Sequence, residues 1–305
     1  MQSQLKACLE KIQQKTPDIL ITYPLESTRQ ILQQLPHEAP YTYLPGSVTN
    51  LWKKIHDNFS VNTLSLYQHT LLLYLIQRFN TQSLKFKVSP AIIKKFTYSF
   101  HRIINISSDQ KRIYDCYLKD LALCSGRIFP AGARLVEPYS SIQRALVISG
   151  GFSQALKFIN MQAHTRSLKN FFRLHTHLEE LEEFTPEGWQ NTCLLLADML
   201  ILNPQINGLI GGSWFYDPAI SKISPHLEYV QQLIIKNGGF SFYAETEGEN
   251  SDSLIKSNKR RQAFNNGQYT PKCYVIIWPR QALLKWAKKL QNTQKTLTNQ
   301  LVTLD

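Results

Sequence analysis

Apolar residues recur at two different spacings along the chain, and the change from one to the other divides it. Within residues 1–125 they recur every three or four positions, as in QLKACLEKIQQ and NTLSLYQHTLLLYLIQRF, and this spacing predicts amphipathic helices. Serine opens further segments of this kind, at Ser47 in SVTNLWKKIHDNF and at Ser89 in SPAIIKKFTYSFHRII, where a hydroxyl can cap the first free N–H groups. Residues 1–125 are therefore predicted to be a helical region.

Beyond residue 125 the helical spacing gives way to short apolar runs between turn signals. Ser125-Gly126 and Pro130-Ala131-Gly132 interrupt the pattern, because glycine and proline favour turns. A domain boundary is therefore expected near residue 125. Short strands are expected in GARLVEP and ALVISGG, a helix in SQALKFINMQ, and a last helix over residues 281–298.

Strand and helix signals then alternate. Strands are predicted over 171–181, 206–217 and 240–246, helices over 185–203 and 224–239, then a short basic helix over 258–267 and a last strand over 271–279. This order is typical of a sheet built by helical crossovers and predicts an α+β protein. The helix over 185–203 is expected to pack on the sheet through Trp189, Leu194, Leu195 and Met199.

The formal net charge of +12 is spread unevenly. Lysine and arginine are in excess over residues 51–150 and 251–305, whereas aspartate and glutamate are in excess over 151–250. Basic flanks can bind phosphate-bearing ligands, although solvated faces give the same pattern. The basic residues are dispersed and lack a zinc-finger, RNP or GXXG pattern, so nucleic acid is not expected as a partner.

The remaining composition favours a cytoplasmic protein. Five cysteines are scattered without a CxxC pair, which favours reduced thiols over disulfides or structural zinc. No apolar run reaches the roughly 18 residues of a membrane span, and the polar N-terminus does not read as a secretory signal.

The segment LHTHLEELEEF holds the first candidate chemistry. On a strand, His175, His177 and Glu179 share one face. Two imidazoles and a carboxylate could bind a metal, as in non-haem iron enzymes, but a convincing further ligand is absent from the sequence and no metal is expected. Alternatively His177 or Glu179 acts as a general base, or the polar face of an edge strand simply meets solvent.

Two further segments could contact a ligand. Thr185-Pro186-Glu187-Gly188 opens a helix, and free N–H groups at a helix start attract anions, although an ordinary capped helix has the same sequence. In GGSWFYDP, Gly211 and Gly212 permit close approach of a ligand, and Trp214 could form a flat wall for an acyl chain. Packing of these aromatics into the core is the alternative.

The order of elements over residues 127–280 resembles the core of the GNAT-superfamily N-acyltransferases. That resemblance implies an acyl-CoA donor whose pyrophosphate lies at the helix start, on Glu187, Gly188, Trp189, Gln190 and Asn191. The family's donor loop has a fixed pattern: glutamine or arginine, two residues of any kind, glycine, any residue, and then glycine or alanine. The matching segment here, FTPEGWQNT, does not contain this pattern. The helical region 1–125 is expected to pack on a GNAT-like mixed sheet of an acyltransferase-type domain, 126–305.

The same resemblance implies roles for other residues. The strand that carries Gly211, Gly212 and Trp214 would splay from its neighbour and admit the pantetheine arm. A basic turn, Lys259, Arg260 and Arg261, would contact the adenosine phosphate. Either Tyr269 or Tyr274 would protonate the leaving thiolate. The ligand is expected in a groove between the strand ending at Asp217 and the strand starting near Phe240.

The function that follows is acyl transfer from an acyl-CoA or acyl-carrier thioester to an amine of a small molecule or peptide, with His177 or Glu179 deprotonating the acceptor. One alternative is a metal-dependent enzyme of the non-haem iron type that uses His175, His177 and Glu179. A second alternative is a non-catalytic binding protein on the same scaffold, which the missing donor loop favours.

Overall fold

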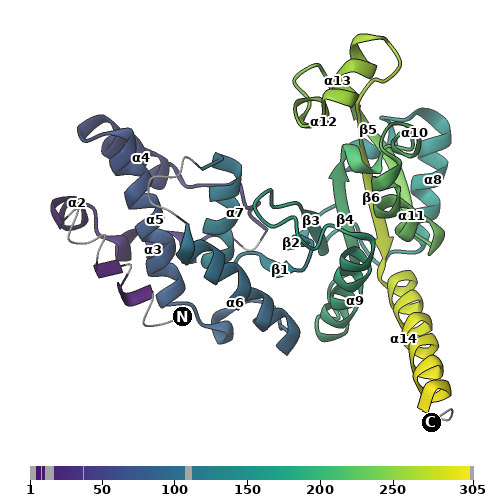
Figure 1. The fold of residues 1–305 in the computed structure, drawn as a ribbon, viewed down its shortest axis with the longest axis horizontal. Coiled ribbons are helices and arrows are strands. Elements are labelled where there is room, and N and C mark those ends of the chain that lie inside the picture. The colour runs from purple at the N-terminus through teal and green to yellow at the C-terminus, as the bar shows by residue number, and fades with distance from the viewer. Residues whose placement is uncertain (1–4, 8, 11–16, 37, 107–111, 303–305) are drawn as a thin grey trace. The chain divides into compact units, whose positions relative to one another are not determined.

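The computed structural model describes the chain except residues 1–4, 8, 11–16, 37, 107–111 and 303–305 (Figure 1). Two compact units divide it. The first comprises Met1–Pro138 and Thr176–Leu181, and the second comprises Tyr139–His175 and Glu182–Asp305. The chain therefore passes from one unit to the other three times, and the boundary expected near residue 125 falls inside the first unit.

The first unit is helical over the described part of residues 1–125, as its apolar spacing predicts. Its helices are α2 Pro17–Thr22, α3 Leu25–Gln33, α4 Gly46–Asn58, α5 Val61–Gln77, η1 Thr81–Ser83, α6 Pro90–Asn105 and α7 Tyr114–Cys124. Ser89 caps α6 by accepting a hydrogen bond from the Ile92 N–H. Ser47 does not cap α4, because the helix begins one residue earlier, after Pro45.

Two short antiparallel strands follow in the same unit. They are β1 Phe129–Ala131 and the first part of β2 Arg134–Ser140. Gly132 joins them with a φ of 68°, a value that glycine adopts more easily than other residues. The strand expected in GARLVEP is thus present.

The second unit is built on strands β3 Phe171–His175, β4 Gly208–Ser213, β5 Phe240–Thr246 and β6 Lys272–Pro279. The strand order is β1-β2-β3-β4-β6-β5. The β3–β4 pair is parallel, whereas β6 pairs antiparallel with both β4 and β5. The sheet is therefore mixed, and the predicted α+β class is confirmed.

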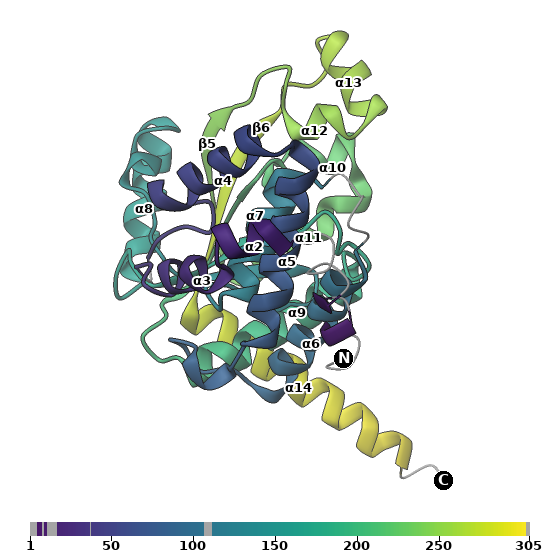
Figure 2. The same ribbon diagram turned by 90° about the vertical axis from the view of Figure 1, so that its left-hand side faces the viewer.

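Helices fill the remaining parts of the second unit. They are η2 Arg144–Val147, α8 Gly151–Ala163, α9 Pro186–Leu202, η3 Trp214–Tyr216, α10 Ile220–Ile223, η4 Pro225–Leu227, α11 Glu228–Lys236, α12 Asp252–Ile255, α13 Asn258–Asn265 and α14 Arg280–Val302. Helix α8 lies on one side of the sheet and α11 on the other (Figure 2). Alternate residues of each strand thus face different helices. On the α8 side, Phe158 and Met161 pack against Ile210 and Phe242.

Helix α9 packs through a face that differs in part from the predicted one. Trp189 and Met199 are buried as expected, but Leu194 and Leu195 are only half-buried. The buried leucines of this helix are instead Leu196 and Leu200.

Three sequence predictions about strands are wrong. The strand expected over 171–181 ends at His175, because residues 176–181 belong to the first unit. ALVISGG forms the helical turn η2 and a glycine turn at Gly151, whose φ is 75°. The groove expected between the strand ending at Asp217 and the strand starting near Phe240 is occupied by β6, which hydrogen-bonds to both β4 and β5.

Among the helices of the described residues, none is long and apolar enough to cross a membrane.

Candidate functional site

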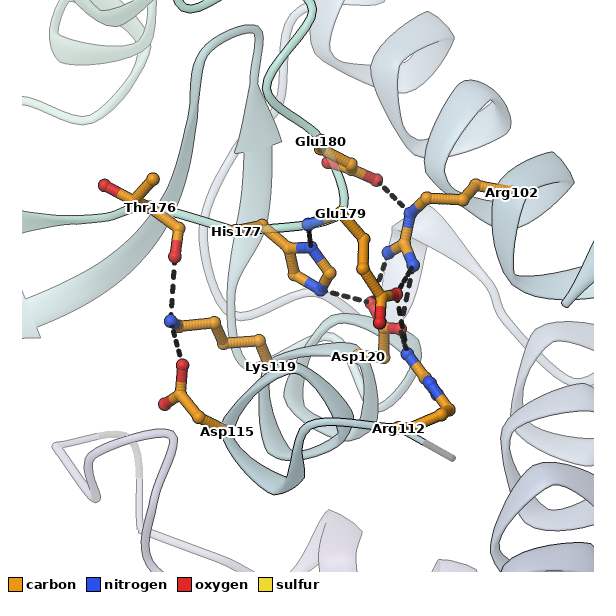
Figure 3. Close-up of polar contacts among 9 residues, drawn as sticks. All are labelled: Arg102, Arg112, Asp115, Lys119, Asp120, Thr176, His177, Glu179 and Glu180. Atoms are coloured by element: carbon orange, nitrogen blue, oxygen red, sulfur yellow. Dashed lines mark hydrogen bonds and ion pairs between the residues drawn. The ribbon is translucent and has the colours of Figure 1, made fainter. Parts of the chain in front are cut away.

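The first cluster of charged side chains lies within the first unit, and we call it the ion-pair network (Figure 3). Asp120 on α7 is 0% exposed and pairs with Arg102 of α6 and with Arg112. Arg102 also reaches Glu179, with Nη1 2.9 Å from Oε2, and Glu180, with Nε 2.8 Å from Oε1. The network therefore ties residues 176–181 to α6 and α7.

His177 belongs to the same network. Its side chain is 1% exposed, its Nδ1 accepts a hydrogen bond of 3.2 Å from the Glu179 N–H, and its Nε2 lies 3.3 Å from Asp120 Oδ1. An accepting Nδ1 places the ring proton on Nε2, directed at Asp120. Both ring nitrogens are thus engaged. His177 and Glu179, expected as acceptor bases, here hold the chain segment in place.

The charges of the network stabilise the ionised form of Asp120. Burial acts to raise the pKa of this carboxyl, but the hydrogen bond from His177 and the charge of Arg102 outweigh burial and lower the pKa below its usual range. A buried carboxylate held in this way stays charged at neutral pH.

Ligand atoms of Asp120, His177 and Glu179 all lie within 4.8 Å of one another, close enough to hold a metal ion. Arg102 and Arg112 already contact both carboxylates, so a cation would have to displace two guanidinium groups. His175, expected as a metal ligand, lies on β3 and is not part of this group. The geometry therefore favours an ion-pair network over an iron site.

The second cluster lies within the second unit, and we call it the Arg260 cluster: Trp214, Asp217, Ser224, Ser253, Arg260 and Tyr269. Arg260 on α13 is 6% exposed, and its guanidinium carbon lies 4.3 Å from the centroid of the Trp214 ring. Its Nε donates to the Ser253 carbonyl oxygen at 2.6 Å, and its Nη1 donates to Ser224 Oγ at 3.1 Å. Three segments distant in sequence therefore meet around one buried cation.

Asp217 contributes a buried anion to the cluster. It is 3% exposed, and its backbone N–H bonds to the Trp214 carbonyl oxygen in the turn η3. Oδ1 accepts from the Ala219 N–H at 2.9 Å, while Oδ2 has no hydrogen-bond partner among the described residues. Burial raises the pKa of Asp217, and that effect is opposed by the Ala219 N–H, by the charge of Lys272 and by the Lys272 N–H.

The two candidate acid tyrosines lie near this carboxylate. Tyr269 is buried, and Tyr274 is half-buried on β6, opposite Ser213 at the end of β4. Burial is the main cause that raises the pKa of each, and the charge of Asp217 contributes to both. Both hydroxyls therefore stay protonated at neutral pH and remain proton donors.

The expected phosphate cradle at the start of α9 is largely occupied by the chain itself. The Gly188 N–H donates to Thr185 Oγ at 3.0 Å, and the Trp189 N–H donates to the Thr185 carbonyl oxygen at 2.8 Å. A Cβ at Gly188 would lie 2.1 Å from the Glu183 carbonyl oxygen, so this glycine is required by its own loop. Gln190, two residues after this glycine, is half-buried.

The strands β3 and β4 part after a short paired stretch. Phe172 and Arg173 pair with Leu209 and Ile210, while the last residues of β4, 211–213, pair with β6. Because alternate peptide groups of a strand face opposite neighbours, part of this stretch presents N–H and C=O groups on the side away from β6.

The two glycines of β4 differ in their surroundings. A Cβ at Gly211 would lie 2.9 Å from the Tyr216 hydroxyl, whereas the nearest atom to one at Gly212 would be Val275 Cγ2 at 3.7 Å. The absence of a side chain at Gly211 therefore lets the aromatic ring of the following turn fold back on the strand.

The predicted basic turn is not a single patch. Lys259 is exposed, and Arg261 donates to the Glu249 carbonyl oxygen at 2.8 Å near the surface, so Arg260 alone enters the cluster. The structure thus brings Trp214, Arg260 and Tyr269 together.

The sequence did not indicate that Asp217, Ser224 and Ser253 belong to the cluster. Asp217-Pro218 reads as a turn signal, and serines before short helices read as caps, so neither pattern indicated a shared site.

No protein-family model matches the chain, and no curated protein matches it. Among solved structures, the chain is similar to one described as an acyltransferase in complex with decanoyl-CoA, with 11% sequence identity and a TM-score of 0.40 over 87% of this chain and 84% of that chain. At this TM-score the two folds superpose too loosely for residues to be transferred between them.

Proposed function

We propose that the protein transfers an acyl group from an acyl-CoA or acyl-carrier thioester to an amine of a small molecule or peptide. The observation that supports this proposal is the parting of β3 and β4 next to a cluster of protonated tyrosines and a buried carboxylate. A pantetheine arm carries amide groups, and these can pair with those peptide groups of residues 211–213 that face away from β6, as an added strand does.

The aromatic wall beside that stretch suits the acyl part of the donor. Trp214 follows directly on β4 and is buried against Arg260 and Phe215. An acyl chain that packs near such rings gains the hydrophobic stabilisation of burial, about 25 cal/mol per Å².

The proposed reaction is aminolysis of a thioester. The acceptor nitrogen attacks the carbonyl carbon, a C–N bond forms, the C–S bond breaks, and the acceptor gives up a proton to water, from which the tyrosine that acts as the acid is protonated again. The leaving thiolate takes a proton from Tyr274 or Tyr269, whose raised pKa values keep their hydroxyls protonated. General acid catalysis of this kind contributes roughly 100-fold to 10,000-fold to a rate.

The contacts to the phosphates of the donor are part of this proposal. At the start of α9, Thr185 engages the N–H groups of Gly188 and Trp189, which leaves the Glu187 N–H and the side chain of Gln190 for an anion. The exposed Lys259 and the half-buried Arg261 offer positive charge nearer the surface. We assign the phosphates to these groups.

A direct test incubates the protein with acyl-CoAs of short, medium and long chain and a mixture of amines. Release of free thiol is measured continuously, and the acylated amine is identified by mass spectrometry. Tyr274→Phe and Tyr269→Phe are compared as a matched pair, and the variant that lacks the acid should lose roughly 100-fold or more in rate while the other retains activity.

Two results would contradict the proposal. If neither acyl-CoA nor acyl-carrier thioesters yield free thiol, the protein is not an acyltransferase. If the same thioesters raise the melting temperature without turnover, the result favours a non-catalytic binding protein, because a ligand that binds only the native state stabilises it.

A further inference from the structure

Helix α8 is apolar on two opposite faces. Phe158 and Met161 are buried toward the sheet. Phe152, Leu156 and Ile159 follow one another at steps of four and three positions, so they share the opposite face of the helix. These three side chains are 80%, 54% and 63% exposed, and we call them the α8 apolar face. A helix that is apolar all round is normally buried on every side, so this exposure requires an explanation.

A fourth exposed apolar side chain stands just before the helix. Ile148, in the turn that leads from η2 into α8, is 80% exposed, and its carbonyl oxygen accepts a hydrogen bond from the Gly151 N–H. The helix itself lies on the outer side of the second unit (Figure 1). Single exposed apolar residues are ordinary, but a group of them on one element marks a surface that contacts a protein or a membrane.

The helix cannot turn to bury this face, because its other side is bonded to the edge strand β5. Gln154 exchanges two hydrogen bonds with Tyr243: its Oε1 accepts from the Tyr243 N–H and its Nε2 donates to the Tyr243 carbonyl oxygen, each at 2.8 Å. Lys157 Nζ donates to the Ser241 carbonyl oxygen at 2.6 Å. The exposure of the α8 apolar face is therefore fixed by the fold.

The chain segment that contains α8 carries positive charge only. Residues 139–175 include five lysines and arginines and no aspartate or glutamate. Arg144 before the helix, and Arg166 and Lys169 after it, are exposed. Strand β5, to which the helix is bonded, adds a single acidic residue, Glu245. The charge around the α8 apolar face is thus complementary to a negatively charged partner.

We propose that α8 binds the surface of an anionic lipid membrane, with the α8 apolar face among the acyl chains and with Arg144 and Arg166 on the headgroup phosphates. Amphipathic helices that combine apolar and basic residues lie in the plane of the membrane interface, and each basic residue near an anionic leaflet adds attraction. A protein partner fits less well, because a standard interface takes roughly 20–30 residues a side, whereas a membrane needs only the few that protrude here.

The test is co-sedimentation of the full chain with phosphatidylcholine vesicles, with and without phosphatidylglycerol, in the absence of any thioester. We expect binding to the anionic vesicles that weakens as salt is raised, since salt screens exposed charges. Phe152→Ser and Ile159→Ser should each weaken this binding about 10-fold or more, the factor that corresponds to burial of one large apolar side chain.

Ile201→Ser is the matched control for Ile159→Ser. Ile201 on α9 is 62% exposed, so both substitutions remove the same side chain from almost the same exposure. The control should leave vesicle binding unchanged, and thermal denaturation checks that each variant is folded. Arg144→Gln combined with Arg166→Gln should lower binding to the anionic vesicles roughly 25-fold, about 5-fold per arginine.

Several outcomes would overturn the inference. Equal binding to vesicles with and without phosphatidylglycerol would show that the basic residues are not used. Equal losses for Ile159→Ser and Ile201→Ser would show that α8 is not the contact. If no vesicle binds, sedimentation equilibrium gives the oligomeric state, and a dimer that Ile159→Ser dissociates would show that a second copy of the chain covers the face. Absence of acyl transfer would change none of these results.

Discussion

The ion-pair network and the Arg260 cluster both bury charge, but they differ in how that charge is balanced. Asp120 contacts two guanidinium groups and an imidazole, and Arg102 contacts three carboxylates. Arg260 and Asp217 are also buried, at 6% and 3% exposed, but neither forms an ion pair with another residue that the structure describes. An unpaired buried charge lowers stability. We therefore interpret the ion-pair network as a structural feature that stabilises the fold, and the Arg260 cluster as a candidate binding site.

The largest loss of stability is expected when the ion-pair network loses its central carboxylate. Asp120→Asn leaves Arg102 and Arg112 buried without their shared carboxylate, so the free energy of unfolding should fall by about 3–5 kcal/mol. Urea denaturation measures this change. Glu10→Gln, which breaks an exposed ion pair with Lys6 in the same unit, is the control and should lose far less. Equal losses for the two variants would show that the network adds no stability of its own.

A second prediction concerns His69, which lies near the ion-pair network, and the cost of protonating it in the folded protein. Burial, followed by the charge of Arg112, lowers the pKa of His69 from 6.5 to about 4, while Asp120 opposes this shift. Between pH 6.5 and about pH 4, His69 is therefore protonated in the unfolded chain but neutral in the folded chain. The free energy of unfolding falls as the pH is lowered through this range. The loss by pH 4 should be on the order of 3 kcal/mol.

Thermal denaturation between pH 7 and pH 4 measures this loss. His69→Asn should lack this component of the pH dependence, whereas His56→Asn, at an exposed histidine of α4, should keep it. An unchanged pH profile for His69→Asn would mean that other groups cause the acid sensitivity.

A third prediction concerns how η3 is held in the second region. Gly211→Ala places a methyl group 2.9 Å from the Tyr216 hydroxyl, and overpacking of this kind destabilises by about 1–3 kcal/mol. Gly212→Ala meets its nearest atom at 3.7 Å and serves as the matched control with little expected change. If the two variants unfold alike, the turn that carries Trp214 and Asp217 is adaptable and not fixed by close packing.

The smallest change in stability is expected for Arg260→Met, and this variant tests most directly whether the two regions differ. Arg260→Met removes two hydrogen bonds but also removes the desolvation penalty of an unpaired charge, so stability should change by about 1 kcal/mol or less. Methionine can keep the contact with the Trp214 ring. Urea denaturation of this variant beside Asp120→Asn is the measurement. A loss as large as that of Asp120→Asn would make Arg260 a structural residue like Arg102.

Local patterns predicted most of the helices, since spacing and capping act within a few residues. Thr185 caps α9 where the sequence indicated it, and the helices before residue 125 follow their apolar spacing. The end of β3 could not be predicted in this way. His177, Glu179 and Glu180 leave the strand direction because they pair with α6 and α7, and Glu179 and Glu180 lie 67 to 78 positions from the arginines that bind them.

The candidate site shows the same limit. Trp214, Arg260 and Tyr269 were identified by residue type, but Arg260 could not be distinguished from Lys259 and Arg261, because only the direction of α13 decides which of the three is buried. Asp217 and Ser224 join the cluster through a turn and through a hydrogen bond across 36 positions, for which a single sequence carries no signal. Their roles stay predictions until the variants above are measured.

The return of residues 176–181 to the first unit also matters during synthesis of the protein. When the ribosome has released the helices up to α7, Asp120 and its two arginines are present, but His177, Glu179 and Glu180 are still to be made. Domains commonly fold as soon as they emerge. Here the N-terminal unit has to wait for a hexapeptide that arrives after β3, so its completion is coupled to translation of the second unit, and a nascent chain arrested before residue 176 should remain protease-sensitive.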